Sequence, residues 1–302
     1  MTISVSLNPK LLRPGLRAVW GMTMDQWQPQ YTELFDKGVS TLGYEEYQEI
    51  APFGIVPEQR AGVNVSYDDL VNGYTTRLVN VAFGLGYKIT REMVDDNQYK
   101  KMMDLPKALA NSVRLTVENL GANVYNKAFD AVNQPGADGK SLCATDHPLP
   151  GGATLANRPG TDADLAATSL EQMFIDVKAF TDGRGNKIHA VPQKLIVSPT
   201  DMYVASELIK SQYSPETANN AINPVFMNQL LPKGFVENVY LTDTNAWFVR
   251  TDQEGLVVQE RVWPAEFRDD NDFSTLDIKQ ACYFRLAFGS YNPRALYGSS
   301  GA

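Results

Sequence analysis

The clearest periodic pattern in the chain is an alternation of apolar with polar or small residues between Thr76 and Thr90. Apolar side chains recur there at every second position, which is the spacing of a strand with one buried face. The alternating apolar residues are Val79, Val81, Phe83, Leu85, Tyr87 and Ile89. The run covers about 14 residues, whereas an average strand has about 5 to 6. The pattern therefore predicts one strand of unusual length.

A shorter alternation at Val63, Val65 and Tyr67 precedes this strand, and a polar turn region within 68–73 separates the two. We interpret the pair as a long hairpin, whose apolar face needs a partner to cover it. The cover is either a sheet of the same subunit or a neighbouring subunit, across which the hairpin would reach as an arm. The candidate inter-subunit contacts are Val79, Val81, Phe83, Leu85 and Tyr87. In the second case, Phe83→Asp should leave the subunit folded and block assembly.

A helical pattern follows the hairpin. Thr90 can cap a short first helix, and Asp104 with Pro106 is typical of a second helix start, because proline is tolerated in the first turn. One apolar stripe then recurs at spacings of three and four, through Leu105, Leu109, Val113, Val117, Leu120, Val124 and Ala128. The polar face carries Lys107, Asn111, Arg114, Glu118 and Asn119. The pattern predicts a long helix over 104–129 that lies on a sheet.

Residues 1–50 show no sustained period, because Pro14, Pro29 and Gly38 interrupt short aromatic clusters. This segment is either an irregular arm lying on something else or an ordinary packed amino-terminal segment.

The remainder reads as a mixture of helices, strands and loops. We expect a large loop with a small hairpin at 133–167, helices starting at Ser169 and Ser198, and a buried strand at 195–198. An exposed loop at 211–228, paired strands at 239–252 and 255–263, and a final strand at 278–292 complete the pattern. The order predicts an α+β fold.

Charge and composition narrow the function. The 302 residues include 35 acidic and 27 basic side chains, with no Lys/Arg-rich run. Tight binding to nucleic acid depends on such cationic groups, so direct DNA binding is disfavoured, although a container for DNA is not. No stretch approaches the about 18 apolar residues of a membrane helix, and no signal peptide is evident, so we expect no membrane contact and a cytoplasmic site of synthesis.

Candidate chemistry is sparse. The densest group is Cys143, Asp146 and His147, which lacks the surroundings of a catalytic cysteine and a second pair of metal ligands. No phosphate-binding glycine motif is present, and residues 182–186 read as a tight turn rather than a cation loop. Cys143 and Cys282 are expected to be free thiols. We therefore predict no catalytic, cofactor or metal site and no enzymatic activity.

The order of these elements, together with several stretches of sequence, resembles the tailed-bacteriophage major capsid proteins of the Hong Kong 97 type. The stretches are FGIVPEQRAGVNVSYDDL, VNVAFGLGYKITREMVDDNQYKKM, DGKSLCATDHPLPGG followed by ANRPG, PQKLIVSPTDMYVASELIKS and CYFRLAFGSYNPRALYGS. The resemblance covers nearly the whole chain, and none of these stretches is a catalytic fingerprint.

The resemblance implies a phage major capsid fold with five parts. They are an amino-terminal arm (1–50), an extended β-hairpin loop (51–89), a peripheral domain with a spine helix (90–132), an axial domain (133–262) and return strands of the peripheral domain (263–302). It also implies hexamers and pentamers of this chain that close into an icosahedral head, with scaffold, portal and decoration proteins as partners. The shell would assemble in the host cytoplasm and enclose double-stranded DNA in the virion.

Two alternatives have different consequences. An encapsulin-like nanocompartment shell is similar in fold but encloses enzymes, and neighbouring genes would distinguish it from a phage head. A hydrolase using Cys143 or His147 would lose turnover when either residue is replaced by alanine.

Overall fold

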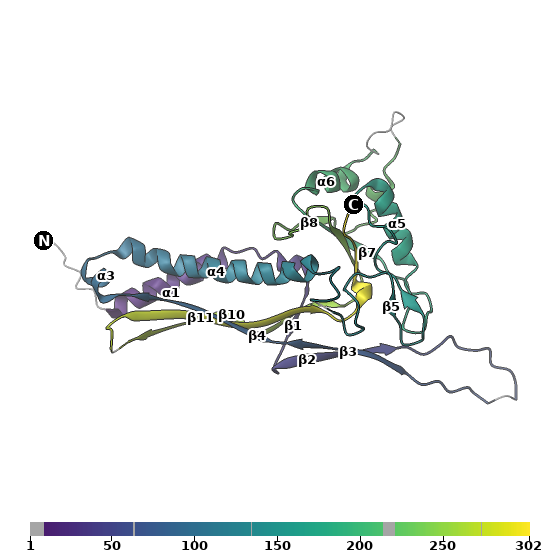
Figure 1. The fold of residues 1–302 in the computed structure, drawn as a ribbon, viewed down its shortest axis with the longest axis horizontal. Helices are drawn as coiled ribbons and strands as arrows, with labels where there is room; N and C mark the ends of the chain where they lie inside the picture. Colours follow the sequence, from purple (N-terminus) through teal and green to yellow (C-terminus); the bar gives the residue numbers. More distant parts are fainter. Residues whose placement is uncertain (1–8, 63, 134, 214–220, 273) are drawn as a thin grey trace.

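The computed structural model describes residues 9–62, 64–133, 135–213, 221–272 and 274–302. A long layer, in which one helix lies over a sheet, carries an upper lobe at one end and a projecting hairpin beneath that lobe (Figure 1). In the described part of the chain, no helix is long and apolar enough to cross a membrane.

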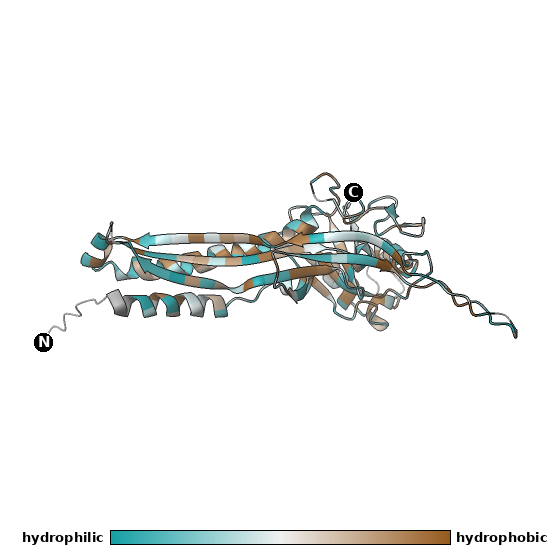
Figure 2. Cartoon of the chain, turned by 90° about the horizontal axis from the view of Figure 1, so that it is seen from below, coloured by the Kyte–Doolittle hydropathy of each residue, from teal (hydrophilic) through white to brown (hydrophobic). Residues whose placement is uncertain are grey.

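The long sheet has the strand order β1-β10-β11-β4. Its strands are β1 (Asp36–Val39), β10 (Leu256–Asn271), β11 (Ile278–Ser290) and β4 (Val81–Ile89). β1 runs parallel to β10, and the other neighbours are antiparallel. β11 confirms the predicted final strand. Figure 2 shows the face of this sheet that no helix covers, where Gly84, Lys88 and Lys279 are exposed.

Helix α4 (Tyr99–Asn126) covers the other face of the long sheet. Its apolar stripe forms one core with Val258, Phe284 and Leu286 of the sheet. The predicted start at Asp104 is wrong, since the helix begins five residues earlier and continues through the buried Pro106. A proline there removes one backbone hydrogen bond, and tertiary packing on the sheet offsets that loss.

The amino-terminal segment packs on its own subunit. It forms α1 (Pro9–Asp25) and α2 (Tyr31–Leu34), so the expectation of an irregular segment is wrong for these residues. Leu16 is buried, and Trp20 stacks on Phe267 with ring centroids 5.1 Å apart. The alternative of an ordinary packed segment is therefore correct for the described part, while residues 1–8 lie outside it.

The hairpin differs from the predicted one. β2 (Tyr44–Ala51) pairs with β3 (Val71–Val79), whereas residues 64–67 form no strand and Val63 lies outside the described residues. The predicted long strand is two strands, β3 and β4, which meet at Asn80. The Asn80 amide donates to Ser40 Oγ at 2.7 Å and to the Leu42 carbonyl at 3.1 Å, and so holds the chain where it passes from one sheet to the next.

The upper lobe contains the second sheet, in the order β12-β9-β7-β8. Its strands are β12 (Leu296–Ser299), β9 (Trp247–Thr251), β7 (Pro192–Val197) and β8 (Phe235–Glu237). Helices α5 (Ala167–Lys178), α6 (Met202–Lys210) and α7 (Pro224–Met227) belong to the same lobe. The predicted small hairpin is present as β5 (His147–Pro148) with β6 (Thr154–Leu155).

The expected pairing of strands 239–252 and 255–263 is wrong. β9 lies in the lobe and β10 lies in the long sheet, because each finds its partners far away in sequence. The border expected between residues 262 and 263 falls inside β10. Two short helical segments, α3 (Arg91–Asp95) and η1 (Pro293–Ala295), connect the strands to their neighbours.

Candidate assembly surface

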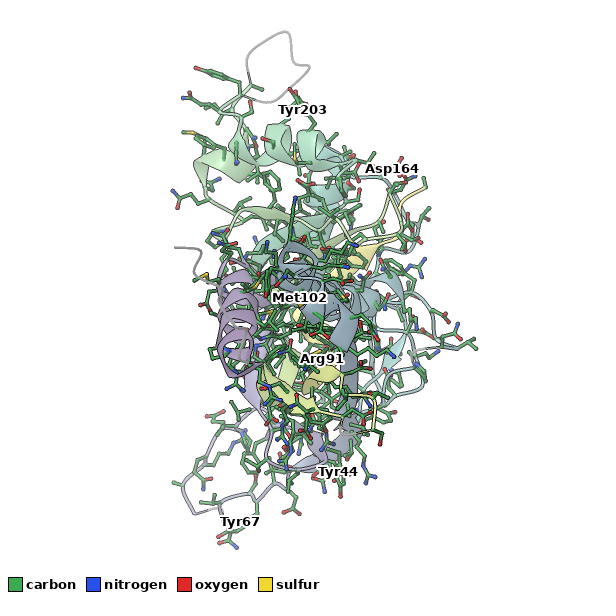
Figure 3. The ribbon with its side chains drawn as sticks, turned by 90° about the vertical axis from the view of Figure 1, so that its left-hand side faces the viewer. Tyr44, Tyr67, Arg91, Met102, Asp164 and Tyr203 are labelled. Atoms are coloured by element: carbon green, nitrogen blue, oxygen red, sulfur yellow. The ribbon has the colours of Figure 1, made fainter. Side chains whose placement is uncertain are left out.

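The surface most available for contact is the extended loop between β2 and β3, residues 52–70. Tyr67, which is labelled in Figure 3, lies on this loop and is 96% exposed. Several large apolar side chains of the loop are more than half exposed, namely Phe53, Ile55, Val56, Val65, Tyr67 and Leu70. A concentration of exposed apolar side chains on a projecting segment is typical of a protein interaction site.

The local sequence explains why the two arms of this loop do not pair as a regular β-ladder. Pro52 and Pro57 lack a backbone donor, and Gly62 has a φ of +84°, so a regular ladder cannot continue through them. Asp68 closes the base of the loop by accepting a hydrogen bond from the Gly54 amide at 2.9 Å. The 63–67 alternation predicts a half-buried strand that is not present at residues 64–67. It gives no indication of Ile55 or Val56, although their position between Pro52 and Pro57 is a usable signal.

The five candidate contacts divide into two groups. Val79, Val81 and Leu85 are 57%, 51% and 53% exposed. Phe83 and Tyr87 are partly buried, since Phe83 stacks on Phe284 with centroids 5.3 Å apart and Tyr87 donates a hydrogen bond to the side chain of Gln280. Part of the alternating face is thus covered by the subunit itself.

The exposed members lie where the long sheet ends. β4 is an edge strand of that sheet, so one row of its backbone groups lacks a strand partner among the described residues. Gly86 allows β4 to pair closely with β11, because a Cβ at this position would lie only 2.9 Å from the Gln280 carbonyl oxygen. The free edge and the side chains of Val81 and Leu85 form one surface, which we call the β4 edge.

The inner part of the hairpin is held by side-chain pairs. Arg77 bonds Glu46 across the two strands at 2.6 Å and lies 4.4 Å from the centre of the Tyr44 ring. Tyr47 stacks on Tyr291 at 4.3 Å with nearly parallel rings. These contacts fix the strands of the hairpin and leave the loop beyond them exposed.

The residues considered for catalysis do not form a reactive site. Cys143 is fully buried, and burial raises the pKa of its thiol far above the usual value. Asp146 pairs with Lys140 rather than with His147. His147 lies between Asp138 Oδ2 at 2.6 Å and Asn157 Oδ1 at 3.1 Å. The two ring nitrogens of His147 thus face a carboxylate and an amide oxygen, and neither of these partners is a thiol or a hydroxyl.

Asn157 is the centre of this buried polar cluster. Its Oδ1 accepts from the Ala144 amide at 2.8 Å, and its Nδ2 donates to the carbonyls of Leu142, Pro293 and Leu296. The oxygen can therefore only accept from His147 Nε2. The cluster ties the loop before β5 to the entry of β12, which is a structural role that the sequence pattern did not reveal.

Asp138 supports His147 from the other side. Burial acts to raise the pKa of the Asp138 carboxyl, but hydrogen bonds from His147 and from the Lys140 amide outweigh it and hold the pKa below its usual value. Asp138 is therefore ionised at neutral pH and accepts a hydrogen bond from His147 Nδ1. Both ring nitrogens of His147 are held by partners within the subunit, as expected of a fixed structural group rather than of a general base.

The two thiols provide a direct check on this conclusion. We expect Cys143 and Cys282 to resist iodoacetamide in the native protein, because both are buried and burial raises the pKa of each thiol. Mass spectrometry should find alkylation only after unfolding. Rapid alkylation of Cys143 in folded protein would contradict the assignment.

Turning to metals, no cluster of three His, Cys, Asp or Glu side chains in the described ranges could hold an ion.

The sequence comparison decides the family. A family model described as phage capsid protein matches residues 73–299, which is most of the chain. The chain belongs to the phage capsid protein family. A comparison with curated proteins finds no match to this capsid protein.

Solved structures show the same fold at low sequence identity. The procapsid of bacteriophage JBD30 has a chain with a TM-score of 0.52 and 13% identity, covering 98% of this capsid protein and 77% of that chain. The capsid of an empty GTA particle gives a TM-score of 0.52 and 11% identity, with 98% and 100% coverage. The virus-like particle from Pyrococcus furiosus gives 0.53 and 9%, with 95% and 98% coverage. The predicted phage major capsid fold of the Hong Kong 97 type is confirmed.

Proposed function

We propose that this capsid protein is the major shell subunit of a tailed-bacteriophage head, assembling as hexamers and pentamers into an icosahedral container for double-stranded DNA. The family match over residues 73–299 carries this proposal. The projecting apolar loop and the β4 edge support it, since each offers contact area that the subunit leaves uncovered. Assembly in the host cytoplasm, and contacts with scaffold, portal and decoration proteins, belong to the same proposal.

The proposed division of the subunit follows the observed layers. Residues 51–89 contain the extended loop with its return strands β3 and β4, of which β4 joins the long sheet. Helix α4 with β10 and β11 forms the peripheral domain, and the upper lobe is the axial domain. We place the border after the axial domain near Gly255 instead of residue 262, because β10 belongs entirely to the long sheet, and we assign β12 to the axial domain, because it pairs with β9. Residues 1–50 then form an amino-terminal part that lies on the peripheral domain.

The family model favours a phage head over an encapsulin-like compartment. The likeness to the virus-like particle from Pyrococcus furiosus concerns the fold alone, at 9% identity. A role as an enzyme has no support in the buried state of Cys143 or in the fixed geometry of His147.

Electron microscopy of the expressed chain tests the proposal. Uniform closed shells, formed alone or with a co-expressed scaffold, are the expected result. A persistent small oligomer under both conditions would contradict it. Double-stranded DNA in shells purified from infected cells, rather than protein cargo, distinguishes the phage head from the compartment.

Two substitutions on β4 separate assembly from folding. We expect Leu85→Asp to leave unfolding free energy within about 0.5 kcal/mol of wild type while abolishing shells, because the side chain is exposed in the subunit and its charge would be buried in an interface. Phe83→Asp is instead expected to destabilise the subunit by about 2–4 kcal/mol, because it places a carboxylate in the stack with Phe284. The earlier expectation that Phe83→Asp leaves the subunit folded is thereby revised.

Chemical unfolding and electron microscopy of both variants give the two readouts. Ile175→Asp is the matched control, since Ile175 is exposed to a similar degree but lies on α5 in the lobe. If Leu85→Asp formed normal shells, the β4 edge would not be part of the assembly surface.

A further inference from the structure

At its root, the hairpin that carries the extended loop lies in a narrow space beside the upper lobe, which we call the passage. A Cβ at Gly73 would lie 2.9 Å from Pro150 Cγ, and a Cβ at Gly183 would lie 2.7 Å from the Ala51 Cβ. The Gly151 amide donates to the Gly183 carbonyl at 2.7 Å and so joins the two lobe segments beside the passage. The root of the hairpin is thus in close contact with the lobe.

The turn at 182–186, which the sequence marked only as a tight turn, forms one side of this passage. Asp182 Oδ1 accepts from the amides of Arg184 and Asn186 at 2.8 and 2.9 Å, and the Asp182 amide donates to the Asn186 carbonyl at 2.7 Å. Gly185 has a φ of +88°, which few other residues adopt. The turn therefore holds the backbone of Arg184 in a defined position.

Arg184 reaches from this turn to the extended loop. Its guanidinium contacts both carboxylate oxygens of Asp68, at 3.0 and 3.1 Å, and also donates to the Asp69 carbonyl. Asp68 in turn accepts from the Gly54 amide on the opposite arm of the loop. One arginine of the lobe is thereby connected to both arms.

A second arginine holds the root nearer the body. Arg294 bonds Glu49 of β2 at 2.9 Å and donates to the Thr181 carbonyl at 2.6 Å. Its side chain is only 7% exposed, whereas those of Arg184 and Asp68 are 22% and 44% exposed. Two pockets whose lining includes Glu49 flank this root. The buried Arg294–Glu49 pair is suited to act as a fixed point. The more exposed Arg184–Asp68 pair is suited to a contact that opens.

We propose that the 182–186 turn is a latch, in which Arg184 holds the extended loop against the lobe of its own subunit and sets the direction in which the loop projects. Arg294 and Glu49 form the pivot about which the loop moves when the latch opens. Because the latch pair is partly exposed, salt weakens it more than it weakens the buried pivot. The latch acts within one subunit and goes beyond the proposed shell function, which it does not require.

Hydrogen–deuterium exchange of the full chain tests the latch. In Arg184→Gln we expect the Gly54 amide and the β2–β3 amides next to the loop to exchange about threefold faster, which corresponds to loss of a partly exposed ion pair. Exchange in α4 should remain unchanged. A spin-label distance between Glu58→Cys and Glu171→Cys should broaden in the same variant, since the two native thiols are buried and unreactive.

Arg60→Gln is the matched control, because Arg60 lies in the loop and makes no ion pair with the residues that the structure describes. Arg184→Gln combined with Asp68→Asn should accelerate exchange by less than the product of the two single effects, since the two substitutions share the Arg184–Asp68 contact. The latch would be overturned if the loop amides exchanged equally fast in Arg184→Gln and Arg60→Gln. It would also be overturned if exchange in α4 rose as much as exchange next to the loop in Arg184→Gln.

Wild-type protein gives an independent measurement if Arg184→Gln does not fold. Raising salt from about 0.05 M to about 0.5 M should accelerate loop exchange while leaving the amides around Glu49 unchanged. No response to salt would count against the latch. These results are independent of shell formation, so failure of the latch and failure of the proposed function are distinguishable.

Discussion

Asn157→Leu is expected to cost the subunit about 3–5 kcal/mol of unfolding free energy. Asn157 is completely buried, and leucine has the same number of side-chain heavy atoms and the same branching but no polar atom. The substitution leaves the Ala144 amide and His147 Nε2 without their acceptor, and the Leu142, Pro293 and Leu296 carbonyls without a donor. A buried group left without its partner costs about 1–3 kcal/mol.

Asn157→Asp separates hydrogen bonding from shape. Aspartate retains the acceptor toward Ala144 and His147 but turns a second carboxylate oxygen toward three carbonyl oxygens. We expect a loss at least as large as with leucine, since repulsion adds to the missing donor. Urea unfolding followed by tryptophan fluorescence measures both variants, because Trp247 is buried in the same lobe.

Asn123→Ala is the control for the loss of an asparagine. Asn123 is exposed on α4, and its replacement should change stability by less than about 0.5 kcal/mol. If Asn157→Leu is as stable as Asn123→Ala, the buried cluster does not hold the loop to β12.

The role of Asn157 could not be predicted, because its partners come from two separate parts of the chain, residues 142–147 and 293–296. The pattern around it indicates a loop rich in glycine and proline, and this is where the residue lies. By contrast, α4 was predictable from its apolar spacing, because the residues on the buried face of a helix recur every three or four positions in the sequence. Groups that converge from distant segments leave no such periodic signal.

The same distinction between local periodicity and contacts with distant segments explains which features of the hairpin were predictable. Alternation from Val79 to Ile89 identified strand structure correctly, because strand periodicity is local. It could not show that Tyr44–Ala51 is the partner of β3 or that Asn80 divides the run in two. Nor could it separate exposed Leu85 from partly buried Phe83, since that depends on how far α4 extends over the sheet edge. The structure thus divides the five predicted contacts into exposed and partly buried residues, and their contact with another subunit stays a prediction.

Glu118 shows how a polar residue can be misassigned by pattern alone. The apolar stripe of α4 placed it on the solvent face, yet it is only 4% exposed. Its two carboxylate oxygens accept from the backbone amides of Gln30 and Tyr31, at 2.7 and 3.1 Å. These amides begin α2 and have no partner within their own helix. Glu118 therefore caps a short helix that covers the spine helix.

Glu118→Leu is the second substitution with a large expected effect, about 2–4 kcal/mol of unfolding free energy. Two buried amides lose their acceptor, and α2 loses its connection to α4. Asn119→Leu is the matched control, since it adds the same side chain at the next, exposed position. Thermal and urea unfolding should show a large loss for Glu118→Leu and little change for Asn119→Leu. Equal stability of the two variants would refute the capping role.

The pH dependence of this loss has a definite sign. Burial raises the pKa of Glu118 above its usual 4.5, against the lowering effect of the two amide hydrogen bonds. The folded protein therefore binds this proton more readily than the unfolded chain does, and the resulting stability is fully present below the unfolded pKa. It is lost as the pH rises through the raised pKa of the folded state. The stability difference between wild type and Glu118→Leu should accordingly be larger below pH 4.5 than at neutral pH, and a difference that grows toward neutral pH would show that the amides, rather than burial, dominate.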